Sequence, residues 1–393
     1  MMNNMFPKQL PEFITNRLLF QVEDLIHSNK SKTHLVMGKS PESDSIIMQS
    51  NDYLSIANHP EIKQVHTDAI NKCDASVVMS AIFLQSEKSK PNFEKQLASY
   101  TEMSSCLLSQ SGWAANIGLL QTICAPTTPV YIDFFTHMSL WEGARIADAA
   151  IHPFMHNNLN HLIKQVERYG AGIIIVDSVY STIGTVAPLK ELCDIAERYG
   201  CAIIVDESHS LGTHGPQGAG LVKELELTSK VDFITVSLAK SFAYRAGAIL
   251  GHELISQTLP FVAYPAIFSS TLLPYEIDRL EKTLEIVRGS DERRAQVGRL
   301  ARQLRLGLKQ IGFQVRSQSQ IVAIETADER NTEHVRDYLE DNGIFGSVFC
   351  RPATGKNKNI IRFSINASLS EQDIEKTIEV CRSAYQSGQF TFV

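Results

Sequence analysis

Short apolar runs alternate with helix-like stretches along the middle of the chain. Five runs are apolar over most of their length: 106–109, 130–133, 173–176, 202–205 and 233–239. Unbroken apolar runs of this length are typical of strands buried on both faces of a parallel sheet. The stretches 159–169 and 188–199 between them have the spacing of amphipathic helices. This alternation predicts an α/β fold with a mainly parallel, doubly wound sheet.

The pattern differs at both ends of the chain. Residues 11–29 read as an amphipathic helix, and the part after about residue 280 mixes helices with short strands. We therefore predict an N-terminal helical segment at 1–50, a large domain at 51–280 and a smaller α+β domain at 281–393. The elements expected from here on are mostly helical structure at 275–312, strand-like alternation at 313–326, a helix at 332–342, strands at 344–350 and 359–365, and a last helix at 370–385. Ser370 and Asp373 occupy the capping-box positions of that helix.

Composition narrows the possible partners. The 393 residues carry a net charge of −6, so no global basic surface is available for nucleic acid or anionic membrane. No run approaches the roughly 20 apolar residues that span a bilayer, and the N-terminus has no signal-peptide pattern. The seven cysteines are scattered without a C-x-x-C pair. We expect a cytoplasmic protein with reduced thiols and no metal site.

The stretch from Cys201 to Lys240 carries the candidate chemistry. Asp206 and His209 follow one apolar run, and Lys240 follows the next. Carboxyl ends of parallel strands are where open α/β sheets place their ligands. A Lys amine can hold the aldehyde of pyridoxal phosphate (PLP) as a Schiff base, and an Asp can keep the pyridine nitrogen protonated. Each residue alone has a simpler explanation as a strand end or helix cap, but the combination favours a PLP site.

Three further places are weaker candidates when taken singly. The run 106–109 leads through Ser111, Gly112 and Trp113 into a helix, and the free amides of such a helix start suit a phosphate. His137 follows the next strand, where it could also cap or pack. Asn51 could be a turn former or a ligand contact.

These pieces, in this order, resemble the α-oxoamine synthases. That family is PLP-dependent, has the fold-type-I aminotransferase fold, and condenses an amino acid with an acyl-CoA. The resemblance extends from residues 50–54 to 361–364, and its most specific motif is 206–212 followed by 237–240. It implies that Lys240 is the Schiff-base lysine, that Asp206 pairs with the pyridine nitrogen, that His209 reaches the ring hydroxyl and that His137 stacks on the ring.

The resemblance also implies roles outside this catalytic group. The cofactor phosphate would be bound by Ser111, Gly112, Trp113 and Ser237, with Ser270 supplied by the second subunit of a homodimer. The substrate carboxylate would be held by Asn51, Ser181 and Arg362. The planar fork of an arginine matches a carboxylate bidentately, which agrees with that last assignment.

Two segments depart from the usual family pattern. Residues 77–85 are apolar where most members have a glycine-rich loop, and residues 241–247 contain Phe242, Tyr244 and Arg245 where small residues are usual. Both segments fall where substrates would enter. The segment 77–84 could form a wall for an acyl chain or ordinary core, and the role of Arg245 stays open.

The stretches 107–116, 131–145 and 345–354 resemble one branch in particular, the quorum-sensing autoinducer synthases of vibrios. This resemblance implies a medium-chain acyl-CoA and either S-adenosylmethionine or 2-aminobutyrate as substrates, with decarboxylation to an α-aminoketone signal precursor. Three different functions remain compatible with the residues: a different α-oxoamine synthase, an aminotransferase, and a non-catalytic subunit with the same fold.

Overall fold

The centre of the protein is a seven-stranded mixed sheet. A computed structural model describes residues 9–23, 35–73, 79–83 and 89–393. Its strands are β2 (Ser105–Ser109), β3 (Pro129–Asp133), β4 (Ala150–Phe154), β5 (Ile173–Asp177), β6 (Ala202–Asp206), β7 (Phe233–Ser237) and β8 (Gly247–Gly251). They lie in the order β2-β8-β7-β6-β5-β3-β4, and only β8 runs antiparallel to its neighbours. The predicted fold class, an α/β fold with a mainly parallel sheet, is confirmed.

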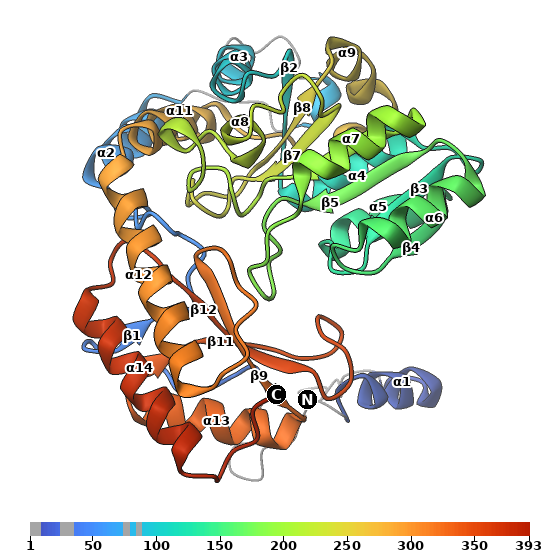
Figure 1. The fold of residues 1–393 in the computed structure, drawn as a ribbon. Coiled ribbons are helices and arrows are strands. Elements are labelled where there is room, and N and C mark those ends of the chain that lie inside the picture. Colours follow the sequence, from blue (N-terminus) through green and yellow to red (C-terminus); the bar gives the residue numbers. More distant parts are fainter. Residues whose placement is uncertain (1–8, 24–34, 74–78, 84–88) are drawn as a thin grey trace, which may run out of the picture.

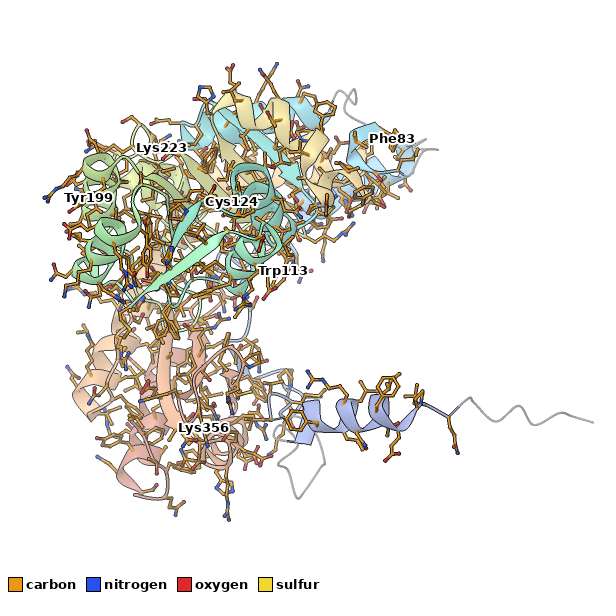
Figure 2. The ribbon with its side chains drawn as sticks, turned by 90° about the vertical axis from the view of Figure 1, so that its right-hand side faces the viewer. Phe83, Trp113, Cys124, Tyr199, Lys223 and Lys356 are labelled. Carbon is orange, nitrogen blue, oxygen red and sulfur yellow. The ribbon has the colours of Figure 1, made fainter. Side chains whose placement is uncertain are left out.

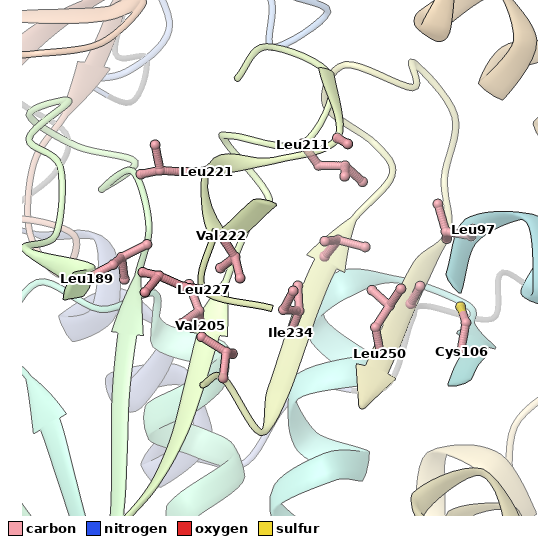
Figure 3. Packing of buried hydrophobic residues seen from close by; sticks show 14 of the residues in the cluster. Leu97, Cys106, Leu189, Val205, Leu211, Leu221, Val222, Leu227, Ile234 and Leu250 are labelled. Carbon is pink, nitrogen blue, oxygen red and sulfur yellow. The ribbon is translucent and has the colours of Figure 1, made fainter. Parts of the chain in front are cut away.

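Helices cover both faces of this sheet (Figure 1). They are α4 (Gly112–Ile123), α5 (Met138–Ile146), α6 (Leu159–Tyr169), α7 (Leu189–Tyr199), α8 (Leu221–Glu224), α9 (Glu253–Val262) and α10 (Tyr264–Ile267). Ile174 and Val205 pack into one apolar cluster, whereas Ile175 and Ile204 pack into another on the opposite face. Figure 3 shows the first cluster, in which Val222 of α8 packs beside Val205 and Ile234. Burial on both faces explains why these strands are continuously apolar.

A second, smaller sheet lies below the first in Figure 1. It is antiparallel, with the order β11 (Ser347–Phe349), β12 (Asn359–Ser364) and β9 (Ile321–Ala327). The helices α12 (Asp291–Ile311), α13 (Glu329–Asp341) and α14 (Glu371–Gln386) lie to its left and below it in Figure 1 and share an apolar cluster with it. The N-terminal β1 (Ile46–Ile47) pairs in parallel with β10 (Ile344–Phe345), so Ile46 and Met48 join the core of this region. The predicted domain boundaries remain a prediction.

The remaining elements connect or flank these two regions. They are α1 (Glu12–Glu23), α2 (Pro60–Lys72), the short η1 (Ala81–Phe83), α3 (Ser89–Thr101), η2 (Pro216–Gly218) and α11 (Pro274–Arg288). The helix predicted at 11–29 is seen at 12–23, and residues 24–29 lie outside the described residues. Of the segment 77–85, residues 77, 78, 84 and 85 also lie outside them.

Of two local predictions for the C-terminal part, the capping box is confirmed and the extent of one strand was wrong. The capping box is confirmed, because Ser370 Oγ accepts from the Asp373 amide at 3.1 Å and Asp373 Oδ2 accepts from the Ser370 amide at 2.8 Å. The strand-like alternation predicted at 313–326 was wrong for its first half, since β9 begins at Ile321. Ile321 is fully buried in the sheet, whereas residues 313–320 make irregular contacts such as the Gln318 amide to Gly184.

None of the described helices combines the length and apolar character needed to cross a membrane. All seven cysteines fall in the described part of the chain and are free thiols, four of them buried.

Candidate active site

Four strands of the large sheet end in polar residues at the same edge. β3, β5 and β6 close with Asp133, Asp177 and Asp206, and β7 closes with Ser237, three residues before Lys240. These strands are parallel, so their carboxyl ends meet at one edge of the sheet. Asp177 and Asp206 are direct partners in the register. The sheet therefore delivers three buried carboxyl groups and the candidate lysine to one place.

Asp206 is held by a short polar network that also contains His137. Its Oδ1 accepts from the Ser208 amide and its Oδ2 from Asn116 Nδ2, both at 2.9 Å. Asn116 Nδ2 also donates to Ser139 Oγ at 2.8 Å, and that hydroxyl lies 2.7 Å from Nδ1 of His137. The candidate ring partner Asp206 and the candidate stacking residue His137 are thus fixed relative to each other through α4 and α5.

The candidate Schiff-base residue Lys240 carries an amine with a lowered pKa. Its side chain is half-buried, and burial together with the nearby positive charge of Arg362 lowers the pKa of its amine, while Asp206 opposes that shift. Within the described part of the chain its Nζ makes no hydrogen bond or ion pair. A lowered pKa increases the fraction of the free amine at neutral pH, which is the form that can bind an aldehyde or take a proton.

The N-terminus of α4 packs tightly against the ends of β7 and β8. A Cβ on Gly112 would lie 2.6 Å from Ser237 Cβ, and a Cβ on Gly247 would lie 2.3 Å from the Ser111 carbonyl oxygen. Ser111 caps the helix by accepting from the Ala114 amide at 3.1 Å. Trp113 lies edge-on to His137, with ring centroids 6.3 Å apart. First-turn amides of a helix are left without intrahelical partners, so this close approach of backbone suits an anion such as phosphate.

Arg362 lies on β12 of the smaller sheet and faces the same site. Its Nη1 donates to the Ser181 carbonyl at 2.8 Å and its Nη2 to Asn51 Oδ1 at 2.9 Å. Its guanidinium lies 4.6 Å from the centroid of the Phe349 ring, and its Nε is buried without a partner among the described residues. The three predicted carboxylate-binding residues are therefore brought together, although Ser181 contributes its backbone carbonyl to this contact and not its hydroxyl.

His209 is buried between the two sheets. Its Nδ1 lies 2.7 Å from the Tyr53 hydroxyl, and its carbonyl accepts from Gln320 Nε2 at 2.7 Å. Burial lowers the pKa of His209 well below its usual range, and the positive charges of Lys240 and Arg362 add to this effect. The imidazole is accordingly neutral at physiological pH.

Two candidates behave differently from this group. Ser270 is exposed, and its backbone bridges Ser80; no contact within the described chain joins it to the rest of the candidate residues. Arg245 donates to the buried Glu276 at 3.0 Å, and the Tyr244 hydroxyl donates to the same carboxylate at 3.1 Å. In one chain, Arg245 therefore serves α11 and not the candidate site.

Several residues of the site were missed from the sequence. Asp177 closes a buried apolar strand in the same way as Asp206, which was a usable signal. Burial and the neighbouring Asp206 raise the pKa of Asp177 well above its usual value, and its Oδ1 accepts from the His137 amide at 3.2 Å. Asn116 lies one helical turn after Gly112, on the face that meets Asp206. Tyr53 gave no comparable signal, because its contact with His209 joins residues 156 positions apart.

A cavity of about 1000 Å³ lies between α2, α3 and α11, and none of the candidate site residues lines it. No described group of three or more His, Cys, Asp and Glu side chains has the arrangement of a metal site.

The residues at the sheet edge fit PLP. The Lys240 amine, with its lowered pKa, suits the aldehyde of the cofactor. The buried Asp206 carboxylate, which Asn116 holds, suits the ring nitrogen. The helix that starts at Gly112 against Ser237 suits the phosphate. Fold and site together define a fold-type-I PLP-dependent enzyme. The individual residue assignments stay predictions.

Comparison with known proteins agrees with this class. Residues 43–380 match the family model for aminotransferase class I and II. The chain is 64% identical over 385 residues to a CAI-1 autoinducer synthase from Vibrio campbellii, covering 98% of both chains. It is 27% identical over 364 residues to a serine palmitoyltransferase from Bacteriovorax stolpii, covering 91% of this chain and 86% of the relative. The solved serine palmitoyltransferase of Sphingomonas wittichii superposes with a TM-score of 0.84 at 21% identity, covering 96% and 97% of the two chains.

The chain belongs to the aminotransferase class I and II family and, within it, to the α-oxoamine synthases. The resemblance inferred from the sequence motifs, including its closeness to the vibrio autoinducer branch, is confirmed.

Proposed function

We propose that the protein condenses a medium-chain acyl-CoA with S-adenosylmethionine or 2-aminobutyrate, releasing CoA and CO₂ and forming an α-aminoketone precursor of a quorum-sensing autoinducer. One observation supports this above all. A buried arginine suited to an amino-acid carboxylate lies beside the Lys240–Asp206 edge, in a chain 64% identical to a CAI-1 autoinducer synthase.

Arg362 and Asn51 would bind the carboxylate of the amino substrate. The unpartnered Nε and the two Nη groups form the guanidinium fork, and Phe349 supports its face. Arginine–carboxylate pairs of this kind are bidentate and orient the bound group as well as attracting it. The substrate carbon next to the carboxylate would thereby be held near the carboxyl edge of the large sheet.

Lys240 would take the proton from that carbon. Its lowered pKa keeps a useful fraction of the amine unprotonated at neutral pH. Bound PLP would supply an aldehyde for the amine and a ring that accepts electron density from the reacting carbon. Asp206 would hold the ring nitrogen, and the network through Asn116 and Ser139 would keep it aligned with His137.

The active form is proposed to be a homodimer. Large apolar side chains are exposed on and beside α4 and α5: Trp113 by 45%, Phe134 by 60%, Tyr264 by 62% and Phe268 by 76%. Figure 2 shows Trp113 at the lower edge of the upper region. Exposed apolar surface of this extent marks an interaction surface. Ser270 lies two residues after Phe268, which supports the expectation that it serves the site of the partner subunit.

The acyl chain is proposed to contact the described part of the apolar segment 77–84. Phe83 is 66% exposed and Met79 44% exposed, so neither is buried core within one chain. Figure 2 shows Phe83 at the periphery of the upper region. Its exposure favours an acyl wall over ordinary core as the role of this segment.

The decisive experiment is an absorbance titration of the purified holoenzyme. S-adenosylmethionine, 2-aminobutyrate, glycine and alanine are added separately, each with and without octanoyl- or decanoyl-CoA, and free thiol is measured in parallel. We expect a spectral change with S-adenosylmethionine or with 2-aminobutyrate. We expect thiol release only when acyl-CoA is also present. A preference for glycine or alanine would indicate a different α-oxoamine synthase.

The same titration distinguishes a synthase from an aminotransferase and from a non-catalytic subunit. Conversion of the cofactor to its amine form by an amino donor without acyl-CoA would indicate an aminotransferase. Absence of a visible cofactor band would support the non-catalytic subunit. The variant Lys240→Ala is expected to lose turnover, and measurable turnover in it would contradict the proposal.

A further inference from the structure

Tyr53 joins the proposed carboxylate site to His209. Its hydroxyl lies 2.7 Å from His209 Nδ1 and 3.3 Å from Asn51 Oδ1. Asn51 Oδ1 in turn accepts from Arg362 Nη2 at 2.9 Å. The ring of Tyr53 is fully buried in a small cluster with Val179 and Ile321, so the hydroxyl is held in this position by packing. The function proposed above gives Asn51, His209 and Arg362 roles but leaves Tyr53 unused.

A tyrosine hydroxyl has one proton to donate, and here two acceptors compete for it. Burial raises the pKa of the Tyr53 hydroxyl, so the group keeps that proton. The distance to His209 Nδ1 is at the favourable length for a hydroxyl donor, whereas the distance to Asn51 Oδ1 is long. Asn51 Oδ1 already has Arg362 as a donor, so it does not need the Tyr53 proton.

The direction of this hydrogen bond decides what His209 presents to the site. The imidazole is neutral because of its burial, so only one of its nitrogens carries a proton. A donor on Nδ1 leaves the proton on Nε2, and no hydrogen bond to the described residues occupies Nε2. Without that donor, the proton could reside on Nδ1 and Nε2 would become an acceptor.

We propose that Tyr53 is a positioning residue that donates its proton to Nδ1 of His209 and so fixes the imidazole as the tautomer with a donor at Nε2. His209 then offers a hydrogen-bond donor to whatever anionic oxygen binds beside it. This inference rests on the proposed function only for its effect on turnover, because the tautomer is a property of the free protein.

The test is nitrogen NMR of the apoprotein with ¹⁵N-labelled histidine. The His209 signals among the twelve histidines are assigned by their loss in His209→Gln. In the wild type, we expect a protonated Nε2 and a hydrogen-bonded, unprotonated Nδ1. In Tyr53→Phe, which keeps the packed ring, we expect the Nδ1 signal to move toward that of a free acceptor or the tautomer to change.

Two further variants sharpen the test. Asn51→Ala removes the competing acceptor and should leave the tautomer as in the wild type. Tyr131→Phe removes another buried hydroxyl, which donates to the Gly170 carbonyl at the far end of the sheet, and should leave His209 unchanged. A proton on Nδ1 in the wild type, unchanged His209 signals in Tyr53→Phe, or a tautomer change in Asn51→Ala would each overturn the proposal.

Steady-state kinetics of Tyr53→Phe provide an independent test of the positioning role. Tyr53→Phe should lower kcat about ten-fold, the worth of one hydrogen bond, while KM for the amino substrate stays near the wild-type value. A rise in KM with unchanged kcat would overturn the positioning role. An inactive wild type with the predicted NMR signature would refute the proposed function and leave the tautomer assignment intact.

Discussion

The pH dependence of stability should reveal one buried carboxyl group, Glu207. Its side chain is fully buried, and its Oε1 accepts from the amides of Leu221 and Val222 and from Ser210 Oγ. Its Oε2 has no partner among the described residues and lies where a Cβ on Gly220 would clash with it, at 2.2 Å. Burial raises the pKa of Glu207 from 4.5 to about 7, although these hydrogen bonds oppose the shift.

The direction in which stability changes with pH follows from the number of protons bound by the folded and the unfolded protein. Between pH 4.5 and about 7 the folded protein holds the Glu207 proton more tightly than the unfolded chain, so stability falls as pH rises through this window. Each pH unit is worth about 1.4 kcal/mol, so the loss from this group amounts to about 3 kcal/mol. Glu207→Gln keeps the accepting oxygen and the shape but cannot ionise. Its stability relative to the wild type should therefore increase by about 3 kcal/mol between pH 4.5 and 7.5.

The assay is urea unfolding of the apoprotein at fixed concentration and at several pH values. The difference between the two proteins isolates Glu207, because every remaining titrating group is shared. Ser210→Ala is the control: it removes a hydrogen bond that lowers the Glu207 pKa, so it should extend the falling phase to higher pH. A difference between Glu207→Gln and wild type that stays constant with pH would refute the reasoning.

Three further outcomes are expected. Arg362→Lys loses the guanidinium fork that contacts Ser181 and Asn51, so it should raise KM for the amino substrate by about 10- to 100-fold. The surface variant Arg316→Lys is the control and should leave KM unchanged. An unchanged KM in Arg362→Lys would argue against the carboxylate site. An equal mixture of inactive Lys240→Ala and Ser270→Asp subunits, reassorted at random into dimers, should regain about a quarter of wild-type activity if Ser270 serves the partner's site, and none if it serves its own. Phe83→Trp should shorten the preferred acyl chain, and an unchanged chain-length profile would exclude Phe83 from the acyl wall.

The fold could be read from the sequence where one physical signal dominated. Strands such as β5 and β6 are buried on both faces, and an unbroken apolar run is the direct consequence. β8 was not predicted, because its Gly-Ala-Ile-Leu-Gly sequence is short and its place between β2 and β7 depends on antiparallel pairing with distant residues. Residues 313–320 alternate in polarity but form no strand, since their backbone bonds, such as that of the Gln318 amide to Gly184, are isolated and do not form a ladder. Periodicity predicts burial well, whereas pairing is decided by the rest of the fold.

The candidate site also contains residues that local sequence patterns predict and residues that depend on the rest of the fold. Asp206, His209 and Lys240 follow strands whose carboxyl ends must meet, so the sequence could place them together. Arg362 comes from the smaller sheet, and only the resemblance to the α-oxoamine synthases connected it with Asn51 in advance. Contacts such as Tyr53 with His209 depend on packing between the two regions, and no local pattern encodes them.

Asp206 and Glu207 illustrate why neighbouring residues of one motif should respond differently to mutation. Successive side chains at the end of a strand point to opposite sides. Asp206 meets Asn116 at the candidate site, whereas Glu207 points the opposite way and accepts from the amides that begin α8. Figure 3 shows Leu221 and Val222 of that helix in the core. Glu207→Gln should therefore change how stability depends on pH while the contact between Asp206 and Asn116 is retained. A parallel loss of cofactor binding in this variant would show that the two sides of the motif are coupled.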